Sequence, residues 1–275
     1  MPSFTGIQSP VRAARIAVSA LFFSAGFCFS SWASRIPAIQ QKMQLNEAGL
    51  GMVLLSLPAG LMLGLPVSGF LVARYGSRVT SIIACLIYAL ILPFLGLVTV
   101  VCQLVIVLFL FGFAGNLLNI AMNTQGVNVE DEYGRSIMTS FHGVWSVAGF
   151  SGAAIGMLML SFSASPFLHF CIITVLVWSI VFVVYKYLPA KDVHSGSNVP
   201  LFAKPDSTLL KLGLIAFCCM VCEGTMFDWS GIYFAKEVHA PKSFTTLGYV
   251  AFMTTMAGGR FAGDWLSVKL GRKNM

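Results

Sequence analysis

The sequence predicts an all-α polytopic membrane protein. Its 275 residues are 57% hydrophobic and only 10% charged, with a mean hydropathy of +0.84, whereas a soluble domain carries about 25% charged residues. A soluble core would not need so little polar surface, so lipid must be the outer solvent. Apolar runs of about 20 residues, the length that crosses a bilayer, recur along the whole chain.

Eight such runs are predicted to be membrane-spanning helices. In chain order they cover residues 16–36, 46–72, 79–99, 102–126, 137–162, 166–188, 208–233 and 243–267. Arg12 and Arg15 precede the first run, which is longer than the apolar core of a signal peptide, so we expect it to remain as a helix. The stretch 189–207 is rich in Pro, Ser and Lys and has no apolar period, as expected for a linker.

The basic residues predict how the chain lies in the membrane. Twelve of the 17 Lys and Arg residues fall in the segments that are inside if the N-terminus is inside, and four fall outside. This bias favours a cytoplasmic N-terminus and a cytoplasmic linker in a multi-pass protein of the bacterial inner (plasma) membrane. The net charge of +7 is spread in small groups and forms no dense patch, so we expect no nucleic-acid partner.

The chain contains a repeat with an offset of 195 residues. Residues 71–78 and 266–273 are short basic turns, each after an even-numbered predicted helix. The same offset pairs small residues in the helices before them, Gly64 with Gly259 among them. Small residues four apart let helix backbones approach closely. A six-helix repeat joined by an inner linker is one plan of secondary transporters.

The first basic turn resembles the loop motif of the major facilitator superfamily, G-x-x-x-D-R-x-G-R-R/K. The matching residues are Gly69, Arg74, Gly76 and Arg78. Ala73 replaces the usual acid, and Ser77 replaces the first terminal Arg. The second copy has Asp264, Lys269, Gly271 and Arg272 at the equivalent places. Stretches 30–39, 119–130, 133–146 and 223–230 are similar to those of a YbjJ-like bacterial inner-membrane subgroup.

The resemblance implies the fold and the function. Residues 1–188 would form the complete N-terminal six-helix bundle, 189–207 a cytoplasmic linker, and 208–275 the first two helices of a second bundle. Members of the superfamily have twelve helices, so we expect this chain to be a truncated form. The implied function is secondary active transport of a small polar, sugar-like solute by alternating access, coupled to protons. We expect a monomer without enzymatic activity, cofactor or metal site.

Polar residues inside the predicted helices are candidates for binding the solute or coupling protons, because stranding them in lipid is costly. Glu223 lies within the seventh helix and is the candidate for proton coupling. Three amides lie on one helical face at Asn116, Asn119 and Asn123, and suit a hydroxyl-rich solute. His142, Trp32 and Trp145 complete the set. For each residue a structural role, such as hydrogen bonding between helices, remains the alternative.

Two further groups are predicted to hold conformations of the transporter. Arg35 and Asp228, at the outer ends of the first and seventh helices, are expected to contact one another and close the outer side. The alternative is that Arg35 reaches the lipid headgroups. By resemblance, the basic turns with Arg74, Arg78, Lys269 and Arg272 would make contacts on the inner side, although positive-inside anchoring alone explains their charge.

Rival classes remain open at this point. Residues 149–152 match GxSG, so an intramembrane serine protease using Ser151 is the enzymatic alternative, but no His follows on the seventh or eighth helix to activate it. A non-transporting membrane remnant or sensor is the third class. The CxxC of Cys219 and Cys222 lies in an apolar helix, where free cysteine behaves as a small apolar side chain.

Overall fold

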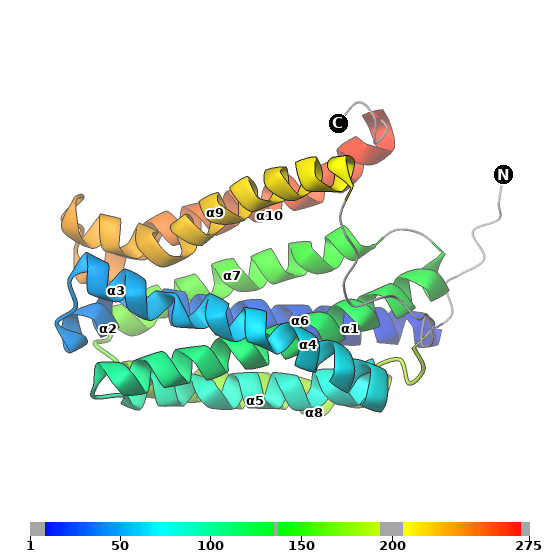
Figure 1. Cartoon of the computed structure of the whole chain (residues 1–275), viewed down its shortest axis with the longest axis horizontal. Helices are drawn as coiled ribbons and strands as arrows, with labels where there is room; N and C mark the ends of the chain where they lie inside the picture. Colours follow the sequence, from blue (N-terminus) through cyan, green and yellow to red (C-terminus); the bar gives the residue numbers. More distant parts are fainter. Residues whose placement is uncertain (1–8, 135–136, 193–205, 271–275) are drawn as a thin grey trace.

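The computed structural model describes residues 9–134, 137–192 and 206–270, and every regular element in these ranges is a helix. The long helices run roughly parallel to one axis of the molecule (Figure 1). In chain order the elements are α1 (Ser9–Ala33), α2 (Ile36–Met43), α3 (Glu47–Leu54), α4 (Ser56–Tyr75), α5 (Ser77–Leu97), α6 (Val101–Tyr133), α7 (Met138–Ser161), α8 (Pro166–Val184), η1 (Tyr185–Tyr187), α9 (Ser207–Lys236), η2 (Lys242–Phe244) and α10 (Leu247–Leu270).

Seven helical segments of the described chain are long and apolar enough to cross a membrane. Two of them join short helices to long ones: Pro10–Met43 contains α1 and α2, and Glu47–Tyr75 contains α3 and α4. The eighth predicted span corresponds to α10, which has the length but is not among the seven. Its sequence includes Arg260, Asp264 and Lys269, which make it less apolar. The predicted all-α membrane fold is therefore confirmed.

The first span is interrupted near one end of the molecule. The chain turns at Ser34 and Arg35 and then re-enters a helix with Pro37 in its first turn, where a missing N–H costs nothing. Gln44 ends α2 in a left-handed conformation, with φ of 52°. Asn46 then begins α3 by accepting a hydrogen bond from the backbone N–H of Gly49 at 2.8 Å. We name this the outer end, following the predicted orientation.

The opposite, inner end has two tight connections. Gly76 joins α4 to α5 at φ of +80°, a value that L side chains rarely adopt, so the position requires glycine. Glu130, close to the end of α6, accepts hydrogen bonds from the backbone N–H groups of Ile137 and Met138, at 2.7 and 2.8 Å. Its carboxylate thereby satisfies donors at the start of α7 that have no partner within the helix.

Glycines set the closest helix contacts. A Cβ added at Gly60 of α4 would overlap the carbonyl oxygen of Phe109 in α6, and one at Gly112 of α6 would overlap that of Leu57. The predicted close approach is also seen at Gly64 of α4, where such a Cβ would lie 3.3 Å from the carbonyl oxygen of Phe113 in α6. The repeat partner Gly259 in α10, by contrast, has no atom of the described residues within 4 Å of such a Cβ.

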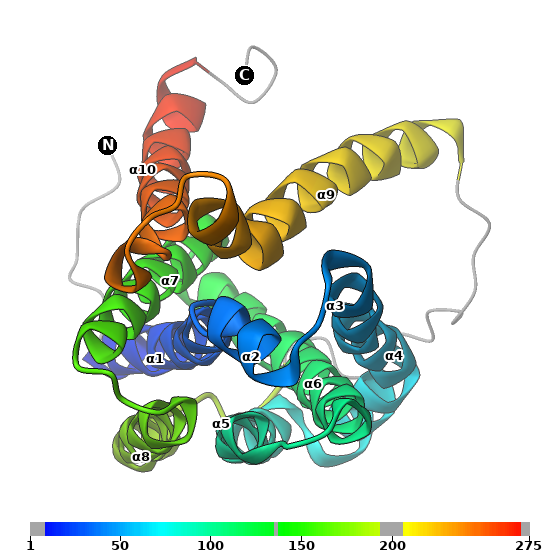
Figure 2. The same cartoon turned by 90° about the vertical axis from the view of Figure 1, so that its left-hand side faces the viewer.

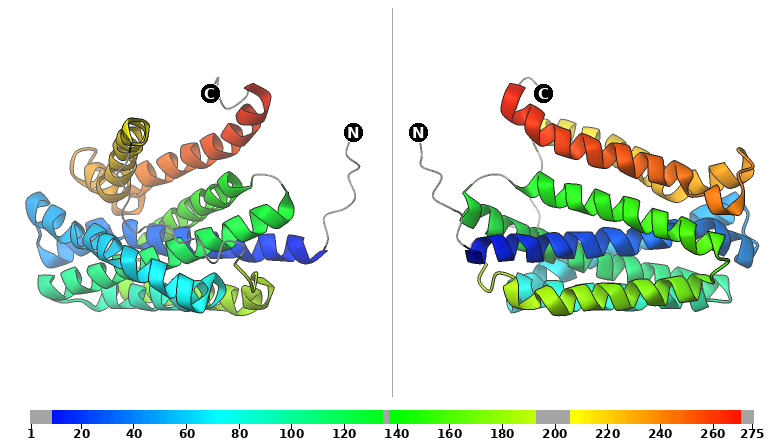
Figure 3. Two further views of the ribbon diagram at one scale, coloured as in Figure 1. Left: turned by 45° about the vertical axis from the view of Figure 1, so that its right-hand side comes forward. Right: turned by 180° about the vertical axis from the view of Figure 1, so that it is seen from behind.

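Helix α1 contacts α5, α6, α7 and α8, whereas α4 packs against α6 and α5. Figure 3 shows α10 running alongside α7, and these two helices pack against one another. Helix α9 reaches α1 and α2 near the outer end, and α9 and α10 diverge from there (Figure 2). Every residue from 206 to 222 is exposed. The last two helices therefore meet the others at the outer end and separate from them toward the inner end.

Candidate functional site

An aromatic layer joins four helices near the outer end. Phe227 of α9 is its centre, with ring centroids 5.3 Å from Phe29, 6.0 Å from Trp145, 5.7 Å from Tyr249 and 5.6 Å from Phe252. These partners come from α1, α7 and α10. Offset and edge-on ring pairs at such distances are favourable, so one side chain connects α9 to three other helices.

A charged pair lies one helical turn further in. Glu223 Oε1 of α9 is 3.7 Å from Arg260 Nη2 of α10, and about a quarter of each side chain is exposed. The guanidinium also donates from Nη1 to Ser146 Oγ at 2.7 Å and to the carbonyl of His142 at 3.2 Å. Its Cζ is 5.7 Å from the ring centroid of Trp145. Arg260 therefore connects the predicted proton-coupling residue to α7.

A cavity of about 160 Å³, here called the central cavity, lies against Trp145. Asn119 of α6, Phe29 of α1 and Tyr88 of α5 line it together with Trp145. This wall combines aromatic faces with one amide, and such a surface suits a small solute that has both hydroxyl groups and apolar ring faces.

The three predicted amides do not act together. Asn116 is buried and accepts a hydrogen bond from Ser68 Oγ of α4 at 2.9 Å, which is the structural alternative stated for it. Asn123 donates to the carbonyl of Asn119 at 2.8 Å and to its side-chain oxygen at 3.2 Å. Of the three, Asn119 lines the central cavity, and Asn123 supports it from the next turn.

The two remaining predicted solute residues have packing contacts. The His142 ring lies edge-on to Phe22 at 5.2 Å. Trp32 is 1% exposed in the core around α1, and its Nε1 has no partner in the described chain. Trp32 does not line the central cavity, because its side chain lies in the packed interior of the first helices.

The predicted contact between Arg35 and Asp228 is absent from this conformation. No ion pair joins them in the described part of the chain; Arg35 is buried and donates from Nε to His169 Nδ1 of α8 at 3.0 Å. The break after α1 turns the guanidinium into the bundle, toward α8 and away from α9. Glu47 of α3 and Lys236 of α9 form an ion pair at the outer end instead.

The first copy of the loop motif makes specific contacts at the inner end. Arg78 donates from Nη2 to the carbonyl oxygens of Tyr185 and Lys186 at 3.0 and 3.3 Å, where cations complement the end of a helix. Arg74 is exposed, and Gly69 faces open space. In the second copy, Gly271 and Arg272 lie outside the described residues, as do the side chains of Asp264 and Lys269.

An acid that sequence reasoning did not single out completes this end. Asp192, just after η1, accepts hydrogen bonds from the Ser77 backbone N–H at 2.8 Å, from the Ser77 hydroxyl, and from Asn128 Nδ2 at 2.8 Å. Ser77 is the first residue of α5. The carboxylate thus caps α5 and joins α8 to α6, next to the turn in which Ala73 replaces the acid of the motif.

The structure does not support an intramembrane serine protease that uses Ser151. The Ser151 hydroxyl donates to the carbonyl of Val147 in its own helix at 2.9 Å. His169 is not placed to activate it, because its Nδ1 accepts the bond from Arg35. Cys219 and Cys222 are exposed, like every other residue of α9 up to position 222.

Two members of the site were missed at the sequence level. Arg260 is a basic residue inside an apolar helix, which is itself a signal of function, but the sequence did not show which acid it faces. Phe227 lies in a chain with 23 phenylalanines, so nothing in its type distinguished it. Only the crossing of four helices makes it central.

Comparison with known proteins agrees with this architecture. Residues 17–275 match the Major Facilitator Superfamily. An uncharacterised MFS-type transporter of Yersinia pestis is 33% identical over 91% of this chain and 65% of its own length. An uncharacterised transporter of Sinorhizobium fredii is 33% identical over 92% of this chain and 68% of its own. The chain thus spans about two thirds of the length of these relatives.

A solved structure shows the same arrangement of helices. The nucleoside transporter NupG superimposes with a TM-score of 0.60 at 17% identity, over 95% of this chain and 69% of that one. At this identity the likeness concerns the fold alone. The match of the family over nearly the whole chain, the similarity to transporters of two bacteria and the shared fold lead to one conclusion: the chain belongs to the Major Facilitator Superfamily of multi-pass membrane transporters.

Proposed function

We propose that the protein is a proton-coupled secondary transporter of a small, hydroxylated polar solute in the bacterial inner membrane, with its N-terminus in the cytoplasm. The main observation behind this proposal is the ion pair of Glu223 and Arg260. It lies between the aromatic layer and the inner ends of α9 and α10, where these helices separate from the others. This placement supports a conformation that is closed outside and open inside, as alternating access requires.

The charged pair suggests how protons and solute are linked. With Glu223 ionised, its attraction helps to hold the guanidinium of Arg260 between α9 and α10. Protonation removes that attraction and leaves Arg260 bound to Ser146 and the His142 carbonyl of α7. The contact between α9 and α10 therefore depends on whether Glu223 carries a proton.

The solute class follows from the side chains around Trp145. Asn119 offers both a donor and an acceptor for hydroxyl groups, and Trp145 and Phe29 offer aromatic faces. Arg260 does not line this cavity, but its charge lies 5.7 Å from the ring centroid of Trp145. The hexuronate transporter of Bacillus subtilis is 22% identical over 87% of this chain. Hexuronates, which carry hydroxyl groups and a carboxylate, are therefore the first solutes to test, with nucleosides second because of the NupG fold.

The test is transport into proteoliposomes. The 275-residue chain and the longer Yersinia relative are reconstituted separately, and uptake of labelled D-glucuronate, D-glucose and uridine is measured with and without a pH gradient. Glu223→Gln should abolish the stimulation by the pH gradient and retain solute exchange at equal pH, because it cannot release a proton. The exposed Glu237 at the end of α9 supplies the control, Glu237→Gln.

The outcomes of this transport experiment distinguish a proton-coupled transporter from a non-transporting remnant or sensor, and they test the solute class. Equal gradient-driven uptake by the wild type and Glu223→Gln would exclude the coupling role. Transport by the relative but not by this chain would favour the non-transporting remnant or sensor. Absence of transport by both, across the solute panel, would contradict the proposed solute class.

A further inference from the structure

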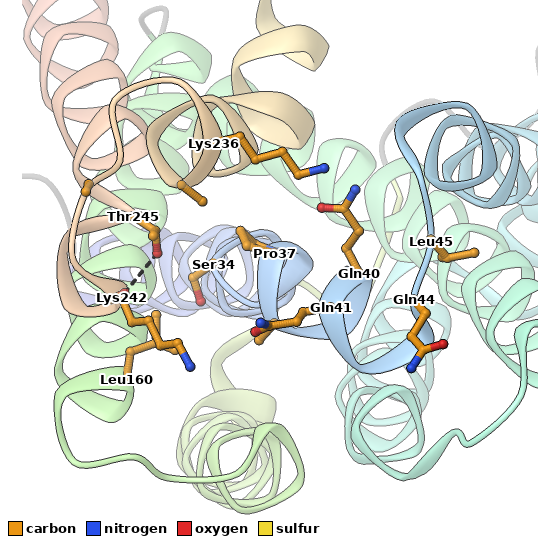
Figure 4. A pocket seen from close by; sticks show the side chains of 13 residues that line it. Ser34, Pro37, Gln40, Gln41, Gln44, Leu45, Leu160, Lys236, Lys242 and Thr245 are labelled. Atoms are coloured by element: carbon orange, nitrogen blue, oxygen red, sulfur yellow. Dashed lines mark hydrogen bonds between the residues drawn. The ribbon is translucent and has the colours of Figure 1, made fainter.

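A second, larger cavity lies at the outer end, on the far side of the aromatic layer. Its volume is about 520 Å³, and its walls come from the turn after α1 at Ser34, from α2 and the residues that follow it, from α7, and from the end of α9 with its connection through η2. Figure 4 shows Gln40 and Lys236 pointing toward one another across it. The lining mixes apolar residues, such as Pro37 and Leu160, with a group of polar ones: Ser34, Gln40, Gln41, Gln44, Lys236, Lys242 and Thr245.

One of these side chains, Gln40, is buried without a hydrogen-bond acceptor for its amide nitrogen among the described residues. Gln40 is 5% exposed, and its Nε2 has no hydrogen-bond partner in the described chain. A buried amide donor left without an acceptor costs free energy, whereas one that meets a ligand oxygen is stabilised. Gln40 lines the cavity, so an acceptor group placed there would satisfy it.

The charges favour an acceptor that is an anion. The described residues that line the cavity include Lys236 and Lys242 and no carboxylate. Lys236 is partly neutralised by Glu47, but this pair is about half exposed, and exposed ion pairs are weak. A carboxylate in the cavity would gain charge-assisted hydrogen bonds from the lysines, and hydroxyl groups on the same molecule would meet the amides of Gln41 and Gln44.

We propose that this cavity is a second solute site, which binds a small hydroxylated carboxylate from the outer side. Its ligand contacts α2 on one wall and the α9–η2 connection on the other. These walls already approach closely, since a Cβ at Gly231 of α9 would lie 3.0 Å from Pro37 Cγ of α2. A bound solute therefore bridges the two sides of the outer contact and favours the conformation that is closed outside.

The experiment measures binding of D-glucuronate to the full chain in lipid nanodiscs, with D-glucose as the matched sugar that has no carboxylate. Glucuronate should bind at least about tenfold more tightly, because its carboxylate accepts charge-assisted hydrogen bonds that glucose cannot accept. It should also slow hydrogen exchange in both walls, residues 36–45 and 235–246. Lys242→Gln and Gln40→Leu should each weaken binding by about tenfold.

Matched controls locate the bound sugar. The exposed Lys211 at the inner part of α9 and the exposed Gln103 of α6 supply Lys211→Gln and Gln103→Leu, which should leave binding unchanged. Glu223→Gln should also leave it unchanged, so failure of the proposed coupling does not affect this result. Binding that is lost in Glu223→Gln but kept in Lys242→Gln, or equal binding of glucose and glucuronate, would overturn the second site.

Discussion

Arg35 donates from Nε to Nδ1 of His169 at 3.0 Å, and both residues are buried. Because Nδ1 is the acceptor, the proton of a neutral His169 lies on Nε2, which has no partner in the described chain, as is also true of Arg35 Nη2. This contact fixes the break between α1 and α2 onto α8. The outer ends of three helices are thus joined by a polar bond inside an apolar bundle.

Replacing the acceptor in this bond should destabilise the protein. His169→Phe keeps a ring but leaves the buried guanidinium without its partner, at a cost of about 2 kcal/mol or more. His169→Asn retains an acceptor at the δ position and should recover part of the loss. Thermal unfolding in detergent measures both variants. Equal melting temperatures for the His169→Phe variant and the wild type would show that the bond contributes nothing to stability.

Truncating the centre of the aromatic layer should loosen the outer end. Phe227→Ala removes four ring pairs, each worth about 0.5–1.5 kcal/mol. We expect hydrogen exchange in α2 and in the outer turns of α9 to speed up about tenfold or more. Phe217 lies on the same helix but is 64% exposed, so Phe217→Ala should change little. Similar exchange in the two variants would contradict the closing role of the layer.

Adding a single methyl group at Gly60 should push α4 and α6 apart. Gly60→Ala places a Cβ against the carbonyl oxygen of Phe109, and overpacking of this kind costs about 1–3 kcal/mol. Gly69 lies on the same helix with open space around it, so Gly69→Ala should be neutral or slightly stabilising. Thermal unfolding of the two alanine variants provides the comparison. A fall in melting temperature for both would point to a general effect of alanine.

Removing the charge of Asp192 should weaken the inner end. In Asp192→Asn the bonds to Ser77 and Asn128 are no longer all satisfied, since an amide nitrogen replaces one acceptor oxygen. We expect a loss of about 1–3 kcal/mol and faster hydrogen exchange in the first turn of α5. Glu132, exposed near the end of α6, gives the control Glu132→Gln. Unchanged exchange in α5 would exclude the capping role.

The sequence predicted the spans well because each depends on a local property, the length of an apolar run. It placed the turn at Gly76 for the same reason, since glycine and neighbouring basic residues mark it. The break at Ser34 and Arg35 was missed, because it falls at the very end of the predicted run 16–36 and the apolar Ile36 follows it. Pro37 was the available signal, as proline often marks a helix start.

The site was less predictable because its contacts join distant segments. Glu223 and Asn119 were identified by their polarity in apolar helices, but their partners depend on which helices meet and at what depth. Arg35 was matched to Asp228 by their outer positions alone, whereas the helix break directs it to His169. Spacing along one helix shows which residues share a face; it does not show what that face meets.

The length of α6 has a mechanical consequence. Its 33 residues extend for about 50 Å at 1.5 Å per residue, against about 30 Å for the hydrocarbon core of a bilayer. The helix must therefore tilt or project into the headgroup region, and Glu130 lies near its inner end, bonded to the first turn of α7. These hydrogen bonds of Glu130 connect the inner end of α6 to the start of α7. If either helix tilts at the inner end, the other is therefore expected to move with it.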